Sequence, residues 1–402
     1  MRLDSDMVLI GTGLAPLIAA QILLRQGKSV LLLNPEYDFF GENSEFGFDP
    51  LLPWQGGEIA RRLTESNIEA VLRDLQPEFP GALETWPGTR SGYRDSLAPF
   101  VRSRQRLFVG RVEEDHWPIR EEVALLAMEA GAKVQTIAGW DALKGFPGMS
   151  ANKISDPGRY RGMSVSKVAD VDVVRFRNGV REFVRERLGN EGLVVGASPI
   201  EFTAEGVRYR DQGKPVNVRV NEGVLTFWTP KLTSWIKSLT EHYDVKPTLP
   251  LGIRLWEEWS LLSKDPLDPS SIGMIDDLIV WAAGEGDPIE TDGKQLGVLR
   301  RGPLHSMSTR DDSFRAWEDE AASRDSFHLI GDLTREFLHW ERFTLRSLKV
   351  RRTFEWADRH PSFILFRNRF ESRVVTGSEG FVADIVRTAR SAAMRFIEDV
   401  RL

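Results

Sequence analysis

Residues 7–34 restrict most strongly what this chain can fold into. The apolar run Met7–Ile10 predicts a buried strand, which stops at the glycine turn 11–13. Apolar residues with helical spacing follow over 14–25, and a second short apolar run covers 30–33. The order strand, turn, helix, strand predicts a βαβ unit, whose two strands lie parallel in one sheet.

The glycine turn has the chemistry of an anion site. Glycines permit a sharp turn and a close approach of the main chain to a ligand. The N–H groups at the start of a helix, with the positive end of its dipole, favour a pyrophosphate. The third glycine of the dinucleotide fingerprint G-x-G-x-x-G is replaced by Pro16, which the first turn of a helix tolerates. We therefore predict a dinucleotide-binding turn made by Gly11, Thr12, Gly13, Leu14, Ala15 and Pro16.

The second predicted strand ends at Asn34, where a dinucleotide site usually carries an acid that binds ribose hydroxyls. An amide can bond the same hydroxyls, but it is a weaker acceptor than a carboxylate. Glu36 is a possible substitute two residues on, and Pro35 lies between them. The absence of a nearby Arg argues against NADP, because a 2′-phosphate favours a guanidinium.

Composition excludes several classes of function. The chain has 402 residues, enough for two cores, and a net charge of −6, which gives no reason to expect nucleic acid as a partner. It has no apolar run near the roughly 20 residues of a membrane span, and its first strand leaves no room for a signal peptide, so we expect a cytoplasmic protein. With no Cys, and no two of its six His at helical metal-site spacing, we expect no metal site and no cysteinyl flavin link.

Two further parts of the sequence have recognisable patterns. Residues 169–240 predict a helix over 178–188, short strands over 192–195, 199–203, 206–210 and 216–220 with turns between them, and a final apolar strand over 223–228. The preceding residues 145–165, with two Pro and several Gly, predict a loop. Near the carboxy terminus, an apolar strand ends in Gly331-Asp332, and Gly377 and Gly380 precede a helix with one continuous apolar face. Residues 246–320 mix both patterns without a clear period.

Together these segments resemble the FAD-binding superfamily of glutathione-reductase-like fold, in the branch of the amine oxidases, carotenoid desaturases and Rab GDP-dissociation inhibitors. In that branch a Gly-Gly pair follows the acid, and here the corresponding pair is Phe40-Gly41. The resemblance implies FAD as the cofactor, with a ribityl-binding acid and a helix that faces the pyrimidine edge of the flavin. The further residues that it assigns to FAD are Gly41, Glu42, Gly331, Asp332, Gly377, Gly380 and Phe381.

The two carboxy-terminal matches conflict with each other. The superfamily places its Gly-Asp motif next to the closing helix, whereas 45 residues separate Asp332 from Gly377 here. One of the two is misassigned, and we favour the helix. Gly331-Asp332 is equally well explained as a strand end with a turn.

We expect an α/β fold with two parts. A Rossmann-like FAD-binding domain would be assembled from the discontinuous segments 1–75, 165–240 and 325–402. An α+β substrate or cap domain would take 76–164 and 241–324.

The expected function is that of an FAD-dependent oxidoreductase, which transfers a hydride from a small or apolar organic substrate to the flavin. The sequence identifies no catalytic residue. Arg301 and His305 are candidates in what we expect to be a loop, with surface solubility as the alternative explanation, and His339 is a third. The alternatives are a non-enzymatic protein that binds a protein or lipid partner, like the GDP-dissociation inhibitors, and an NAD-dependent dehydrogenase. The oligomeric state stays open.

Overall fold

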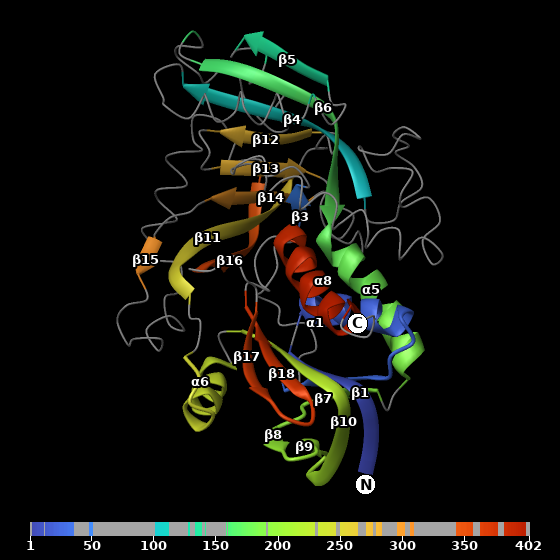
Figure 1. The fold of residues 1–402 in the computed structure, drawn as a ribbon. Helices are drawn as coiled ribbons and strands as arrows, with labels where there is room; N and C mark the ends of the chain where they lie inside the picture. Colours follow the sequence, from blue (N-terminus) through green and yellow to red (C-terminus); the bar gives the residue numbers. More distant parts are fainter. Residues whose placement is uncertain are drawn as a thin grey trace.

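A computed structural model of the chain shows two sheets with a helical layer (Figure 1). The part of the chain that it describes comprises residues 2–11, 13–35, 48–50, 101–111, 128, 133–138, 141, 158, 160–189, 192–229, 232–246, 250–263, 271–275, 279–283, 296–301, 306–308, 343–356, 362–376 and 382–398.

The first sheet contains the predicted βαβ unit. Its strand order is β17-β18-β10-β1-β2-β7, with β9 paired to β10 and β8 paired to β9. The five strands from β18 to β7 run parallel. Their bounds, with those of the antiparallel strands, are β1 Arg2–Ile10, β2 Val30–Asn34, β7 Leu193–Val195, β8 Glu201–Thr203, β9 Gly206–Asp211, β10 Lys214–Phe227, β17 Ser362–Arg367 and β18 Glu371–Val375.

Three helices cover one face of this sheet, and the short strands β8 and β9 lie on the other side (Figure 1). The helices are α1 Leu14–Arg25, α5 Val173–Leu188 and α8 Val382–Glu398. The core between sheet and helices joins side chains such as Leu9 and Phe227 to Ile18 and Ala389. A second core on the opposite face joins β1 and β2 to the β8–β9–β10 ribbon. A fourth helix, α6 Thr233–His242, packs Ile236 against Trp228 just after β10.

Helix α8 packs directly against α1 and crosses β10. Its buried face is rich in small residues, with Ala389, Ala392 and Ala393 at most 2% exposed. A Cβ at Gly223 of β10 would collide with the ring of Phe396, so this glycine lets the aromatic ring lie on the strand. The carboxy-terminal helix is therefore an integral part of the sheet's cover.

The second sheet is built mainly from antiparallel strands and lies at the other end of the molecule (Figure 1). Among its described strands the longest pair is β11 with β16, near one end of the sheet, and Trp259 of β11 is completely buried. Its strands are β3 Phe48–Pro50, β4 Val101–Arg111, β5 Lys133–Ala138, β6 Tyr160–Asp172, β11 Pro250–Ser263, β12 Ser271–Ile275, β13 Ile279–Ala283, β14 Leu296–Arg301, β15 Ser306–Ser308 and β16 Phe343–Trp356. The domain boundaries predicted from the sequence stay a prediction.

The structure confirms the α/β fold class and the βαβ unit, with three corrections. The strands expected at 216–220 and 223–228 are one strand, β10, because its first half pairs with β9 and its second half continues beside β1. The helix expected at 178–188 begins at Val173, directly after β6. Residues 160–165 belong to β6 and are not part of a loop, since they pair with β4 and β5.

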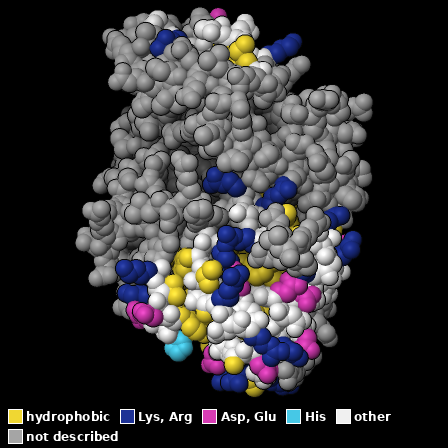
Figure 2. Space-filling view, viewed as in Figure 1, with side chains coloured by type: hydrophobic (Ala, Val, Ile, Leu, Met, Phe, Trp, Pro, Cys, Tyr) yellow, Lys and Arg dark blue, Asp and Glu magenta, His cyan; other side chains and the backbone are white. Residues whose placement is uncertain are grey.

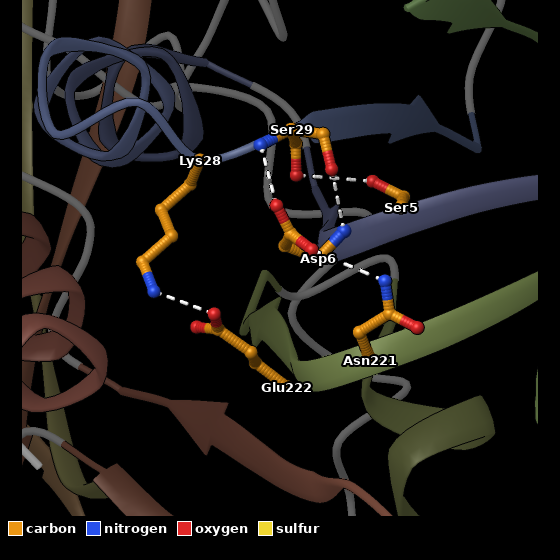
Figure 3. Close-up of polar contacts among 6 residues, drawn as sticks. All are labelled: Ser5, Asp6, Lys28, Ser29, Asn221 and Glu222. Carbon is orange, nitrogen blue, oxygen red and sulfur yellow. Dashed lines mark hydrogen bonds and ion pairs between the residues drawn. The ribbon is translucent and has the colours of Figure 1, made fainter. Parts of the chain in front are cut away.

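A polar cluster joins three segments at the amino-terminal half of β1 (Figure 3). The N–H of Ser29 donates to Asp6 Oδ2 at 2.9 Å, and the N–H of Asp6 donates to the Ser29 hydroxyl at 2.8 Å. Asn221 of β10 donates to Asp6 Oδ1 at 3.1 Å. Beside them, Lys28 pairs with Glu222 at 2.5 Å. The cluster therefore ties the start of β2 and the middle of β10 to β1, at a bulge between Ser5 and Met7.

The hydrogen bonds of this cluster determine how Asp6 titrates. Partial burial alone would raise the pKa of Asp6, but the donors on Ser29 and Asn221, together with Lys28, outweigh it and lower the pKa below 3.8. Because the folded-state pKa is lowered, the stabilisation is fully present above the unfolded-state value. It is lost as the pH falls through the folded-state pKa.

We predict that Asp6→Asn destabilises the fold by about 1 kcal/mol near neutral pH, because the N–H of Ser29 loses its charged acceptor. The difference in melting temperature between this variant and the unchanged protein should shrink between about pH 5 and pH 2. Thermal unfolding of both proteins at several pH values measures this difference in melting temperature. Asp4→Asn, at an exposed position of the same strand, is the charge-matched control. A difference that persists at the lowest pH would contradict this account.

Candidate functional site

The parallel strands of the first sheet end at one edge, and the candidate site lies there. The chain leaves β1 through α1 and returns as β2 on one side, whereas β10 occupies the other side of β1. In open α/β sheets, ligands bind at the carboxyl ends of strands where the strand order reverses in this way. The final residues of these strands are Ile10, Asn34, Val195, Phe227 and Val375.

Gly11 is the residue at which the main chain leaves β1. Its φ is +155°, which residues with side chains rarely adopt, and its N–H donates to the carbonyl of Leu33 at 3.1 Å. A Cβ at Gly11 would lie only 2.9 Å from Cβ of Phe227. Glycine therefore lets the turn pass close to the end of β10.

Gly13 is the N-cap residue of α1. Its φ is 83° and, as a glycine, it has no side chain that could cap the helix. The first turn of α1 itself carries no acidic residue that would compete with an anion for the positive end of the helix. Ala15 carries an N–H that has no partner within the helix, whereas Pro16 has none to donate. These residues are buried, and they fit a pyrophosphate held by main-chain groups.

Asn34 lies one strand away at the same edge. It is 1% exposed, pairs in register with Val195 of β7, and accepts a hydrogen bond from the N–H of Ala197 at 2.9 Å. Pro35 follows at a half-buried bend. Val195, in contrast, is 40% exposed although it is a large apolar residue. An exposed apolar side chain beside the end of β2 is suited to contact a flat ring such as a nucleobase.

Sequence reasoning missed Val195, Ala197 and Phe227 as site residues. Each belongs to a strand end or turn that the sequence does predict, but no local pattern shows that β7 lies beside β2 or β10 beside β1. The main chain after Phe227 is held in turn by β18, because the N–H of Trp228 donates to the carbonyl of Val375 at 2.8 Å.

Several predicted site residues lie outside the described part of the chain. They are Thr12, Glu36, Gly41, Glu42, His305, Gly331, Asp332, His339, Gly377, Gly380 and Phe381. Their assignments stay predictions. Arg301 is placed, and the loop expected there is wrong: it is the last residue of β14, paired in register with Glu257 of β11 and Ile279 of β13.

The described residues add three observations about other kinds of site. Among them, no group of three or more His, Cys, Asp or Glu side chains is arranged to hold a metal ion. No helix within the described ranges has the length and apolarity to cross a bilayer. On the face in Figure 2, basic and acidic side chains of the described residues are interspersed over the lower part of the molecule.

Comparison with solved structures places this geometry among known folds. NikD, an amino acid oxidase essential for nikkomycin biosynthesis, matches with a TM-score of 0.69 at 14% identity, over 99% of this chain and 95% of that chain. Glycine oxidase from Geobacillus kaustophilus matches with a TM-score of 0.63 at 10% identity, over 99% and 94%. L-α-glycerophosphate oxidase from Mycoplasma pneumoniae, solved with FAD bound, matches with a TM-score of 0.64 at 10% identity, over 98% and 95%.

These similarities extend over nearly the whole chain and show its fold. No protein-family model matches the sequence, and no curated protein matches it. The fold class predicted from the sequence, α/β with a Rossmann-like sheet, is confirmed. The branch of amine oxidases, carotenoid desaturases and GDP-dissociation inhibitors stays a prediction.

We predict that Gly11→Ala removes dinucleotide binding and lowers stability by about 2 kcal/mol, because the new Cβ meets Phe227 and the φ is unfavourable for alanine. Gly27→Ala is the matched control, since Gly27 has a φ of +77° but nothing within 4 Å of a new Cβ. The control should lose some stability and keep ligand binding. Melting curves with and without a dinucleotide separate the loss of stability from the loss of binding. Unchanged dinucleotide binding in Gly11→Ala would contradict the assignment of Gly11 to the binding turn.

Proposed function

We propose that this protein is an FAD-dependent oxidoreductase that oxidises a small organic molecule. The observation that carries the proposal is the glycine turn from Gly11 to the start of α1, at the point where the strand order reverses. It combines a close main-chain approach with a helix amino terminus whose N-cap residue is a glycine.

The shared fold supports FAD over other dinucleotides. One of the solved structures with this fold contains FAD, and 98% of the chain aligns with it. In this arrangement the pyrophosphate would lie on residues 11–16, and the adenosine would extend toward Asn34 and Val195. The helix α8 follows the segment predicted to face the flavin. Bound FAD would supply a two-electron acceptor for a hydride from the substrate, with oxygen or another acceptor completing the cycle.

We infer that the substrate is a small anion with a C–H bond next to an amine or a hydroxyl group. The solved structures of this fold include oxidases or dehydrogenases of amino acids, proline, iminodiacetate and glycerophosphate. Arg301 is our candidate for binding the anionic group of the substrate, because a guanidinium binds carboxylates and phosphates in bidentate fashion. His305 and His339 stay candidates without a role.

The two alternatives have less support. An NAD-dependent dehydrogenase with a single Rossmann domain would not need the second sheet, which takes up much of the chain. A non-enzymatic partner-binding protein is motivated only by the altered motif positions Pro16, Asn34 and Phe40. A cytoplasmic location stays a prediction from the sequence.

We predict that FAD stabilises the protein specifically. The purified protein should be yellow, and FAD at 100 times its Kd should raise the free energy of unfolding by about 2.7 kcal/mol. NAD at the same concentration should have no effect. A melting temperature that does not respond to FAD would overturn the proposed function, and a response to NAD alone would favour the dehydrogenase.

We predict that Arg301→Gln raises the KM for the substrate at least about tenfold, because one charged hydrogen-bonding pair is worth that much. Substrates are found first, by anaerobic bleaching of the bound flavin with a panel of amino and hydroxy acids. Arg300→Gln is the matched control, because Arg300 is the neighbouring residue of β14 and pairs in register with Glu258 as Arg301 pairs with Glu257. Equal effects in both variants would argue against a role for Arg301 in substrate binding.

A further inference from the structure

We draw no further inference here: the strongest candidate, the cluster of Arg367, Glu371 and Arg373 on the hairpin of β17 and β18, consists of an exposed and a buried guanidinium that both already pair with the same carboxylate, and nothing in the described part of the chain shows a ligand for it.

Discussion

The parallel alignment of β10, β1 and β2 is the constraint on which the rest of the structure depends. The central strand β1 bonds to β10 over residues 2–10 and to β2 over 7–10, so all three strands end at the same level. This brings Gly11, Asn34 and Phe227 to one edge, although the last is about 200 residues from the others in sequence. The helices α1, α5 and α8 then cover the face that the strands leave open.

Two different kinds of contact hold β1. At the middle of the strand, the Asp6 cluster provides side-chain hydrogen bonds to the segment that enters β2 and to β10. At the carboxyl end, the contact is steric: the absence of a side chain at Gly11 allows β10 to approach. The first contact serves stability, whereas the second also shapes the main-chain surface offered to a ligand. Stability and site geometry therefore depend on the same strand but on separate residues.

The departures from the dinucleotide fingerprint affect side chains more than the main chain. Anion binding at a helix amino terminus depends on N–H groups and the helix dipole, which most residue types supply equally. Pro16 removes a single N–H, and Asn34 exchanges a charged acceptor for a neutral one. The fold can therefore persist at 10 to 14% identity to oxidases of known structure while the strength of individual ligand contacts varies.

The sequence by itself determined the βαβ unit, the strands β7 and β9, the amphipathic α8 and the glycine turn, because hydrophobic period and turn residues are local properties. It placed Arg301 in a loop and divided β10 into two strands, since the charged and polar residues there break the apolar pattern. Only the tertiary structure decided that β10 lies against Gly11 and that Val195 lies beside Asn34. Strand partners are chosen by packing between distant segments, and a local pattern of apolar residues shows which face is buried but not what buries it.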